Sequence, residues 1–222
     1  MCFIVAVDGP AGSGKGTVTK RIEKELGLVN LDTGATYRCV ALDAIKHGFK
    51  AEDEEKIIKM LNDINIKIEK KDGKDVIFLN GEDVSKEIRD LPVTKMVSQI
   101  SSIIPVREKL IEIQRGLAKG KNVIAEGRDI GTVVFPDANL KIYLDANEKI
   151  RAERRYKEYL ENGVNTTYEE VLESIKTRDM NDKNKKFGAL KKADDAIVVD
   201  TSNKTIDEVT EEVKGLIKQK MI

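Results

Sequence analysis

Five short apolar runs, separated by helical patterns, constrain the fold of this chain more than any other feature. They are FIVAV (3–7), LVNLD (28–32), NVIAEG (122–127), LKIYLD (140–145) and AIVVD (196–200). Continuous apolar runs of this length are typical of strands that are buried on both faces of a parallel sheet. Strands that alternate with helices predict an α/β fold of three layers, in which helices cover a five-stranded parallel sheet.

The intervals between these runs carry helical patterns with identifiable ends. Residues 15–26 place Val18, Ile22 and Leu26 on one stripe. Two later helices are predicted to begin with capping boxes: residues 168–180 after Thr167 with Glu170, and residues 206–220 after Thr205 with Glu208. In the middle of the chain, residues 94–120 predict two helices that meet near Pro105, and Gly120 is a plausible stop for the second.

Residues 64–85 interrupt the alternation of strand and helix. INIKIEK and DVIFLNGEDVS have strand patterns, and the pairs Asp72-Gly73 and Asn80-Gly81 are typical hairpin turns. The pattern predicts a small antiparallel meander, inserted at the rim of the parallel sheet because it cannot easily join it. Two interpretations stay open, a part of a binding region or a surface decoration.

The composition limits the classes of function. Among 222 residues, 39 basic side chains balance 39 acidic ones, which argues against a dedicated nucleic-acid or membrane-surface binder. Cys2, Cys39 and the single histidine, His47, have no metal-ligand or disulfide spacing, and this fits a reducing cytosol. The opening apolar run is too short for a signal core or a membrane span. We expect a cytoplasmic protein.

A glycine-rich loop, DGPAGSGKGT, joins the first strand to the first helix. Free backbone N–H groups and the positive end of the helix dipole favour phosphate binding at such a loop, and Lys15 can reach the outer phosphates of a nucleotide. Gly9, Gly12 and Gly14 allow the tight wrap. The residues expected to bind ATP are therefore Gly9, Pro10, Ala11, Gly12, Ser13, Gly14, Lys15, Gly16 and Thr17.

The loop departs from the general motif directly after its lysine. The general motif has Ser or Thr there to contact Mg²⁺, whereas this chain has Gly16 and then Thr17. The GKGT ending resembles the loops of nucleoside monophosphate kinases. We expect Mg²⁺ to be held mainly by phosphates and water, with Thr17 helping.

Three further segments carry groups that could bind phosphates. LDTGATYR offers the Thr33 hydroxyl at a helix start and Arg38 one turn later, although both have ordinary structural interpretations as an N-cap and a surface arginine. RDMNDKNKK spaces Arg178, Asp182 and Lys185 for one helix face, but its lysines could equally form a solvated basic run.

The third segment, IRAERRYKEYLENG, follows Asn147, a good N-cap. It places Arg151, Arg154 and Arg155 on one helix face, and the alternative interpretation is an exposed helix held by ion pairs.

The motifs DGPAGSGKGT, LDTGATYR, EGRDIGTVVFPDA and RDMNDKN occur in this order, and together the chain resembles bacterial cytidylate kinases, the (d)CMP kinases, from residue 3 to residue 220. The resemblance implies one P-loop kinase domain over residues 1–222 with a short helical lid. Within it, the acceptor region would span 33–118, its antiparallel insertion about 64–85, and the lid 148–166.

The resemblance also implies roles for individual residues. Those that bind CMP would be Thr33, Tyr37, Arg38, Ser98, Arg107, Arg128, Asp129, Arg178, Asp182 and Lys185. Those that act on the transferring phosphate would be Lys15, Arg128, Arg151, Arg154 and Arg155. Ser98, Arg107 and Asp129 would read cytosine, and Asp129 would disfavour UMP because uracil has a carbonyl where cytosine has an amine. The family pattern has arginine where Lys185 stands, and lysine lacks the planar fork for a bidentate contact.

The implied reaction is transfer of the γ-phosphate of ATP to CMP or dCMP, with Mg²⁺ as cofactor. We expect a monomer that binds neither nucleic acid nor a membrane, and adenine contacts near Thr201 and Ser202. The alternatives are a kinase for UMP or AMP, or a regulator that binds a nucleotide without an acceptor reaction.

Overall fold

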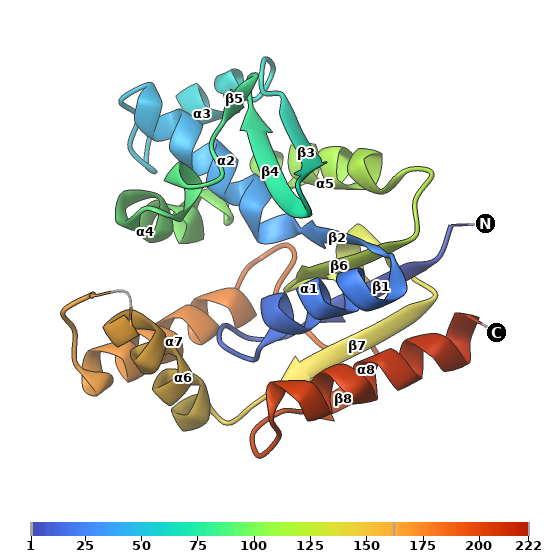
Figure 1. Ribbon diagram of the computed structural model, residues 1–222. Coiled ribbons are helices and arrows are strands. Elements are labelled where there is room, and N and C mark those ends of the chain that lie inside the picture. The colour runs from blue at the N-terminus through green and yellow to red at the C-terminus, as the bar shows by residue number, and fades with distance from the viewer. Residues whose placement is uncertain (1, 162, 222) are drawn as a thin grey trace. The chain divides into compact units, whose positions relative to one another are not determined.

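A computed structural model describes residues 2–161 and 163–221 of the chain (Figure 1). The chain divides into two compact units, which we call the sheet unit (Met1–Leu31 with Gly120–Ile222) and the helical unit (Asp32–Lys119). The boundaries of the helical unit nearly coincide with the acceptor region that the resemblance implies. The function of that region stays a prediction.

The sheet unit is built on the expected five-stranded parallel sheet. Strand β1 lies at its centre between β6 and β7, and the order is β2-β6-β1-β7-β8. Both neighbours of β1 run parallel to it, and β8 runs parallel to β7. The strands are Ile4–Asp8 (β1), Val29–Asp32 (β2), Val123–Gly127 (β6), Leu140–Asp145 (β7) and Ile197–Asp200 (β8).

Helices α1 and α8 share one apolar cluster with the strands of the sheet. Val18 and Ile22 of α1 are buried with Val213 and Ile217 of α8. Both predicted capping boxes are present, at the starts of α7 and α8. The helices of this unit are Lys15–Leu26 (α1), Glu148–Glu161 (α6), Tyr168–Lys183 (α7), Ile206–Met221 (α8) and a short π-helix, Ile130–Val134 (η2).

The helical unit has a hydrophobic core of its own. Its elements are Thr33–Lys46 (α2), Glu54–Met60 (α3), Ile66–Lys71 (β3), Lys74–Leu79 (β4), Glu82–Asp83 (β5), Glu87–Arg89 (η1), Leu91–Ile100 (α4) and Ile104–Ala118 (α5). The two helices expected around Pro105 are α4 and α5, and Pro105 lies in the first turn of α5. Gly120, with a φ of 79°, follows the second helix as expected.

The antiparallel meander forms with the expected turns. Asp72, Gly73, Asn80 and Gly81 all have positive φ, as hairpin turns of this kind require. Its three strands form a sheet separate from the parallel sheet, as expected. Strands β3 and β4 bury Ile66, Ile77 and Leu79 in the core that they share with helices α2, α4 and α5, so the meander is an integral part of the helical unit.

No helix among the described residues is long and apolar enough to cross a membrane.

Candidate active site

The glycine-rich loop wraps between β1 and α1, and its glycines are sterically required. Gly9 has a φ of 149°, and a Cβ there would lie 2.0 Å from the carbonyl oxygen of Leu144. Gly12 has a φ of 77°, and its Cβ would lie 3.1 Å from the Cβ of Arg151. Side chains at either position would collide with neighbouring backbone or with a packed helix.

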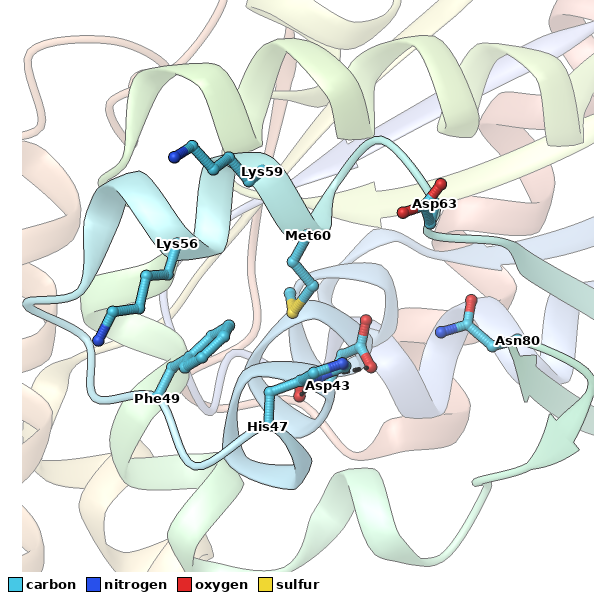
Figure 2. Close-up of a pocket in the computed structure, with 8 residues that line it drawn as sticks. All are labelled: Asp43, His47, Phe49, Lys56, Lys59, Met60, Asp63 and Asn80. Atoms are coloured by element: carbon cyan, nitrogen blue, oxygen red, sulfur yellow. Dashed lines mark hydrogen bonds and ion pairs between the residues drawn. The ribbon is translucent and has the colours of Figure 1, made fainter.

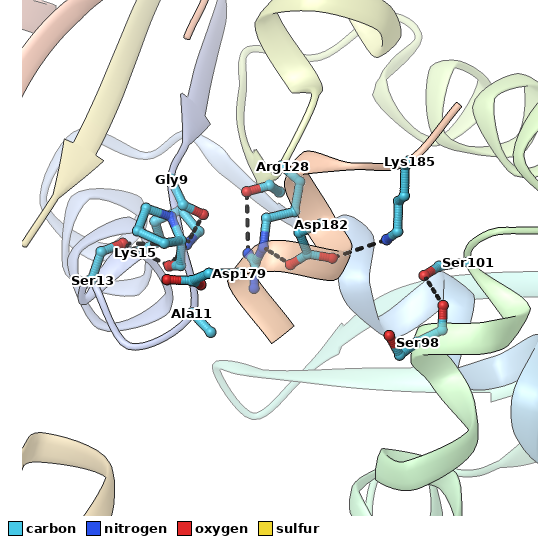
Figure 3. Close-up of polar contacts among 12 residues, drawn as sticks. Gly9, Ala11, Ser13, Lys15, Ser98, Ser101, Arg128, Asp179, Asp182 and Lys185 are labelled. Carbon is cyan, nitrogen blue, oxygen red and sulfur yellow. Dashed lines mark hydrogen bonds and ion pairs between the residues drawn. The ribbon is translucent and has the colours of Figure 1, made fainter. Parts of the chain in front are cut away.

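Lys15 is buried at the start of α1 and turns back onto its own loop (Figure 3). Its Nζ donates to the carbonyl oxygens of Gly9 and Pro10, at 2.7 Å each, and to the Ser13 hydroxyl at 3.3 Å. Burial and the nearby Arg128 lower the pKa of the Lys15 amine well below its usual range. Glu126 and Asp8 oppose this shift, and the negative charge of a nucleotide phosphate would oppose it further.

A carboxylate lies close to the glycine that follows the lysine. A Cβ at Gly16 would lie 3.2 Å from Oε1 of Glu126, an oxygen that also accepts a 3.3 Å hydrogen bond from the Thr19 hydroxyl. Glu126 thus occupies space next to residue 16, while Thr17 is exposed one position later. Glu126 lies within β6, as the apolar run 122–127 predicted.

A second charged cluster joins β6 to the end of α7. Nε of Arg128 donates to Asp182 at 2.9 Å, and Nζ of Lys185 donates to the other oxygen of Asp182 at 3.0 Å (Figure 3). Burial alone would raise the pKa of Asp182, but Arg128, Lys185 and Arg178 lower it to about 2. A single ionised carboxylate therefore holds two cations in place.

One expected detail of this cluster is wrong. Helix α7 ends at Lys183 and Asn184 is its C-cap, so Lys185 does not share a helix face with Arg178 and Asp182. Beyond the helix the backbone N–H of Leu190 returns to the carbonyl of Asp182. The segment after α7 therefore folds back toward the end of the helix. The amine of Lys185, which lies in this segment, still reaches the carboxylate of Asp182.

The three arginines of the expected lid have different partners. Arg151 is buried, donates to the carbonyl oxygens of Ala11 and Ala146, and pairs with Asp179 at 2.6 Å. Arg154 donates to Thr201, and Arg155 pairs with Glu158 on its own helix.

The predicted N-cap Asn147 is confirmed by the bond from the Lys149 N–H to its side chain. Within the expected lid, Asn162 lies outside the described residues.

The helical unit holds the other predicted acceptor residues. Thr33 is the first residue of α2, and the cap of that helix is Asp32, whose side chain accepts from the N–H of Ala35. Arg38 donates to the carbonyl of Ile88 and to the Thr94 hydroxyl. Arg38 is therefore tied to neighbouring elements and is not a freely solvated surface arginine.

Tyr37 and Arg107 lie together in this unit. The guanidinium carbon of Arg107 is 5.3 Å from the centre of the Tyr37 ring, and NH1 donates to the carbonyl of Ser101 at 2.9 Å. Ser98 is half-buried near the end of α4, and its carbonyl accepts from the Ser101 hydroxyl (Figure 3). The sequence missed the buried Gln114, which donates to the hydroxyl of Thr36; a polar residue within the apolar stripe of α5 was the available signal.

The helical unit also contains a cavity of about 430 Å³ that includes none of the predicted site residues (Figure 2). Burial raises the pKa of Asp43 on its wall. The cavity is lined by Asp43, His47, Phe49, Lys56, Lys59, Met60, Asp63 and Asn80.

The family model described as "Cytidylate kinase" matches residues 5–219. The chain belongs to the cytidylate kinase family. It is 46% identical to the cytidylate kinase of Caldicellulosiruptor saccharolyticus over 212 residues, which cover 96% of this chain and 94% of that one. It is 47% identical to the cytidylate kinase of Fusobacterium nucleatum over 207 residues, which cover 93% of each chain.

A solved structure of an uncharacterized protein from Eubacterium ventriosum has the same fold. Its TM-score is 0.52 at 12% identity, with 99% of each chain covered. The cytidylate kinase resemblance and the α/β kinase fold expected from the sequence are confirmed.

Proposed function

We propose that this cytidylate kinase family member transfers the γ-phosphate of ATP to CMP or dCMP, forming CDP or dCDP and ADP, in pyrimidine nucleotide metabolism. The observation that carries this proposal is the family match over residues 5–219, which spans the glycine-rich loop with its buried Lys15. Phosphoryl transfer needs little covalent chemistry from the protein, because alignment and neutralisation of charge supply most of the catalysis.

The donor side is the glycine-rich loop, and its residues fit a nucleotide whose phosphates carry Mg²⁺. No group of three or more His, Cys, Asp or Glu side chains among the described residues could by itself hold a metal ion. Mg²⁺ commonly keeps several waters and binds through substrate phosphates and one or two protein oxygens. The exposed Thr17 hydroxyl and the Glu126 carboxylate beside Gly16 are suited to that role. Bound Mg²⁺ would neutralise charge on the transferring phosphate.

On the acceptor side, we assign phosphate binding to Arg38 and Arg128, and further contacts with CMP to Tyr37 and Thr33. Arg178, Asp182 and Lys185 would approach the sugar and the phosphate. The ion pairs of Asp182 with Arg128 and Lys185 support this assignment, because they hold cations ready in a defined geometry.

Cytosine reading is assigned to Ser98, Arg107 and Asp129. A carboxylate accepts from the exocyclic amine of cytosine, while a hydroxyl and a guanidinium satisfy the ring nitrogen and the carbonyl.

The segment 148–166 is assigned as the lid, and Arg151, Arg154 and Arg155 as its phosphate ligands. Arg151 would have to exchange its contact with Asp179 for the transferring phosphate. Closure would keep water from taking the phosphate.

Two expectations about the cellular setting also belong to this proposal, a cytoplasmic location and a monomeric state. The exposed Cys2 and the buried Cys39 are both free thiols, which suits a reducing compartment. Burial raises the pKa of Cys39 to about 12, so this thiol is inert packing. Light scattering of the purified chain would measure the oligomeric state.

The deciding experiment measures ADP formation from Mg-ATP with CMP, dCMP, UMP, AMP and GMP offered separately. We expect strong turnover confined mainly to CMP and dCMP. Preference for another monophosphate would keep the kinase and overturn the base-reading residues. ATP binding without turnover of any acceptor would make the protein a nucleotide-binding regulator.

Replacing Asp129 with Ala tests the base-reading assignment. We expect kcat/KM for CMP to fall about tenfold to a hundredfold, because one unpaired buried polar group costs about 1–3 kcal/mol. The dissociation constant of Mg-ATP should stay within about twofold. The matched control is Asp137→Ala, an exposed acid in the same loop region. Unchanged CMP kinetics in Asp129→Ala would remove this residue from cytosine recognition.

A further inference from the structure

Asp8 is a buried carboxylate at the end of the central strand, and it is the first residue of the DGPAGSGKGT motif. It is 4% exposed and stands in register with Gly127 of β6 and Tyr143 of β7. Its two oxygens have separate tasks. Oδ1 accepts the backbone N–H of Ile130 at 2.7 Å, and Oδ2 accepts that of Gly131 at 2.8 Å.

These two N–H groups open the short helix η2. The first N–H groups of a helix have no partner within it and are usually satisfied by the N-cap side chain. Here Asp129 is the N-cap residue, yet its side chain makes no capping hydrogen bond. The cap comes instead from Asp8, which lies 122 residues before Ile130 in the sequence.

Supplying the cap from a distant strand has a consequence for the acceptor site. The side chain of Asp129 is not used to cap η2, and the backbone directly after Arg128 and Asp129 is anchored to β1. The residue after Asp8 is Gly9, the start of the phosphate loop. One carboxylate therefore ties the segment of Arg128 and Asp129 to the strand that carries the donor loop.

We propose that Asp8 is a positioning residue for phosphoryl transfer, which holds Arg128 and Asp129 in register with the phosphate loop by capping η2 from the end of β1. The proposal rests on the assignment of Arg128 and Asp129 to the acceptor.

The charge of Asp8 supports a role beyond packing. Burial raises the pKa of its carboxyl to about 6, while the hydrogen bonds from Gly131 and Ile130 oppose the shift. Of the neighbouring charges, Asp129 raises this pKa and Lys15 of α1 lowers it. On β7, burial and acidic neighbours that include Asp8 raise the pKa of Tyr143. An apolar side chain would fill this position without the cost of burying a charge. The carboxylate is therefore better explained by its two hydrogen bonds than by packing.

The test is the substitution Asp8→Asn. The dissociation constants of CMP and of Mg-ATP are measured separately by calorimetry, and kcat is measured with both substrates present. Asparagine has the same shape, but its NH₂ group would face one of the two N–H donors. Losing one hydrogen bond should weaken CMP binding about tenfold. Mg-ATP binding should stay within about twofold.

Asn139→Ala is the matched control, because the side chain of Asn139 accepts the N–H of Ile4 at the opposite end of the same strand. It should leave both dissociation constants unchanged. If Asp8→Asn binds CMP as the parent does, or weakens both ligands equally, the proposal is wrong.

A second measurement needs no variant and so survives a failure of Asp8→Asn to fold. Amide hydrogen exchange is followed in the parent protein from pH 7.5 to pH 5, and the protection of Ile130 and Gly131 is compared with that of Ile4. Asp8 titrates in this range while Asn139 does not, so protection of Ile130 and Gly131 should fall relative to Ile4 below about pH 6. Amides of Ile130 and Gly131 that are unprotected at pH 7.5 would overturn the cap. This measurement involves no nucleotide, so it tests the cap independently of the proposed function. A protein that does not phosphorylate CMP would overturn the proposed function, and hydrogen exchange would still decide whether Asp8 caps η2.

Discussion

The donor loop and the Arg128–Asp182–Lys185 cluster both contain cations that we assign to phosphate binding, but they hold these cations in opposite ways. In the loop, Lys15 is held by neutral carbonyl oxygens of its own segment, and its pKa is lowered. In the cluster, Arg128 and Lys185 share one ionised carboxylate, whose own pKa is lowered to about 2. The loop is a local structure, whereas the cluster joins residues 54 positions apart.

The two sites should therefore be sensitive to different kinds of substitution. The loop depends on backbone geometry, so a single added Cβ can disturb it, and its lysine has no carboxylate partner at hydrogen-bond distance among the described residues. The cluster depends on a balance of charge, so it tolerates small changes of shape but not the loss of Asp182. Substitutions in each region therefore test whether the loop depends on backbone geometry and the cluster on charge.

The largest effect is expected for Lys15→Ala. Removing the cation that we assign to the transferring phosphate should lower kcat on the order of 10³-fold, while the fold is kept. Steady-state kinetics with CMP and a thermal unfolding curve measure both. Lys20→Ala, an exposed position on the same helix, is the control. An undiminished kcat would remove the loop lysine from the mechanism.

Asp182→Asn should come next, and its main effect should be on stability. It leaves Arg128 and Lys185 without their shared charge partner, and breaking a buried pair costs about 3 kcal/mol. Because the pKa of folded Asp182 is about 2, below its unfolded value, the stabilisation is present above about pH 4 and is lost as the pH falls toward 2.

Urea unfolding at pH 7 and at decreasing pH would measure this effect. Asp195→Asn, which removes the exposed partner of Lys141, is the control and should change little. If both variants unfold at the same urea concentration, the cluster does not depend on Asp182 as described.

Gly16→Ala probes the geometry of the loop with a smaller expected effect. The new methyl group would press on Glu126, and the shift should raise KM for Mg-ATP about tenfold, since small misplacements near reacting groups are costly. Gly116→Ala is the control, because that helical glycine has open space around it. The control should stabilise the protein by about 0.5–1 kcal/mol without a kinetic change. Unaltered ATP kinetics in Gly16→Ala would show that Glu126 can move aside freely.

Lys185→Arg should have the smallest effect. It restores the family residue and offers a planar fork, so KM for CMP should fall by about threefold or less. Lys186→Arg, at the exposed neighbouring position, should not change KM. An increase in KM for CMP would mean that the buried site beside Asp182 is shaped for lysine.

Sequence patterns predicted the parts of this fold whose causes are local. The five strands follow from continuous apolar runs, the starts of α7 and α8 from their capping boxes, and the meander from its two turn pairs. Which helices pack against the meander could not be predicted, because its turns do not specify what covers Ile66 and Ile77. The end of α7 at Lys183 was missed for a related reason, since the chain turns back there through a backbone bond to Leu190.

The sequence alone predicts a phosphate-binding loop at the end of the first strand, because the glycines, the lysine and the helix that follows are contiguous. Through its motifs it also determined the family. The tertiary structure alone shows that Glu126 lies beside Gly16, that Asp182 pairs with Arg128, and that Asp8 caps a helix that starts 122 residues later. Each of these contacts joins residues that are far apart in the sequence and meet only once the chain has folded, so no local pattern specifies which distant side chain will lie beside them.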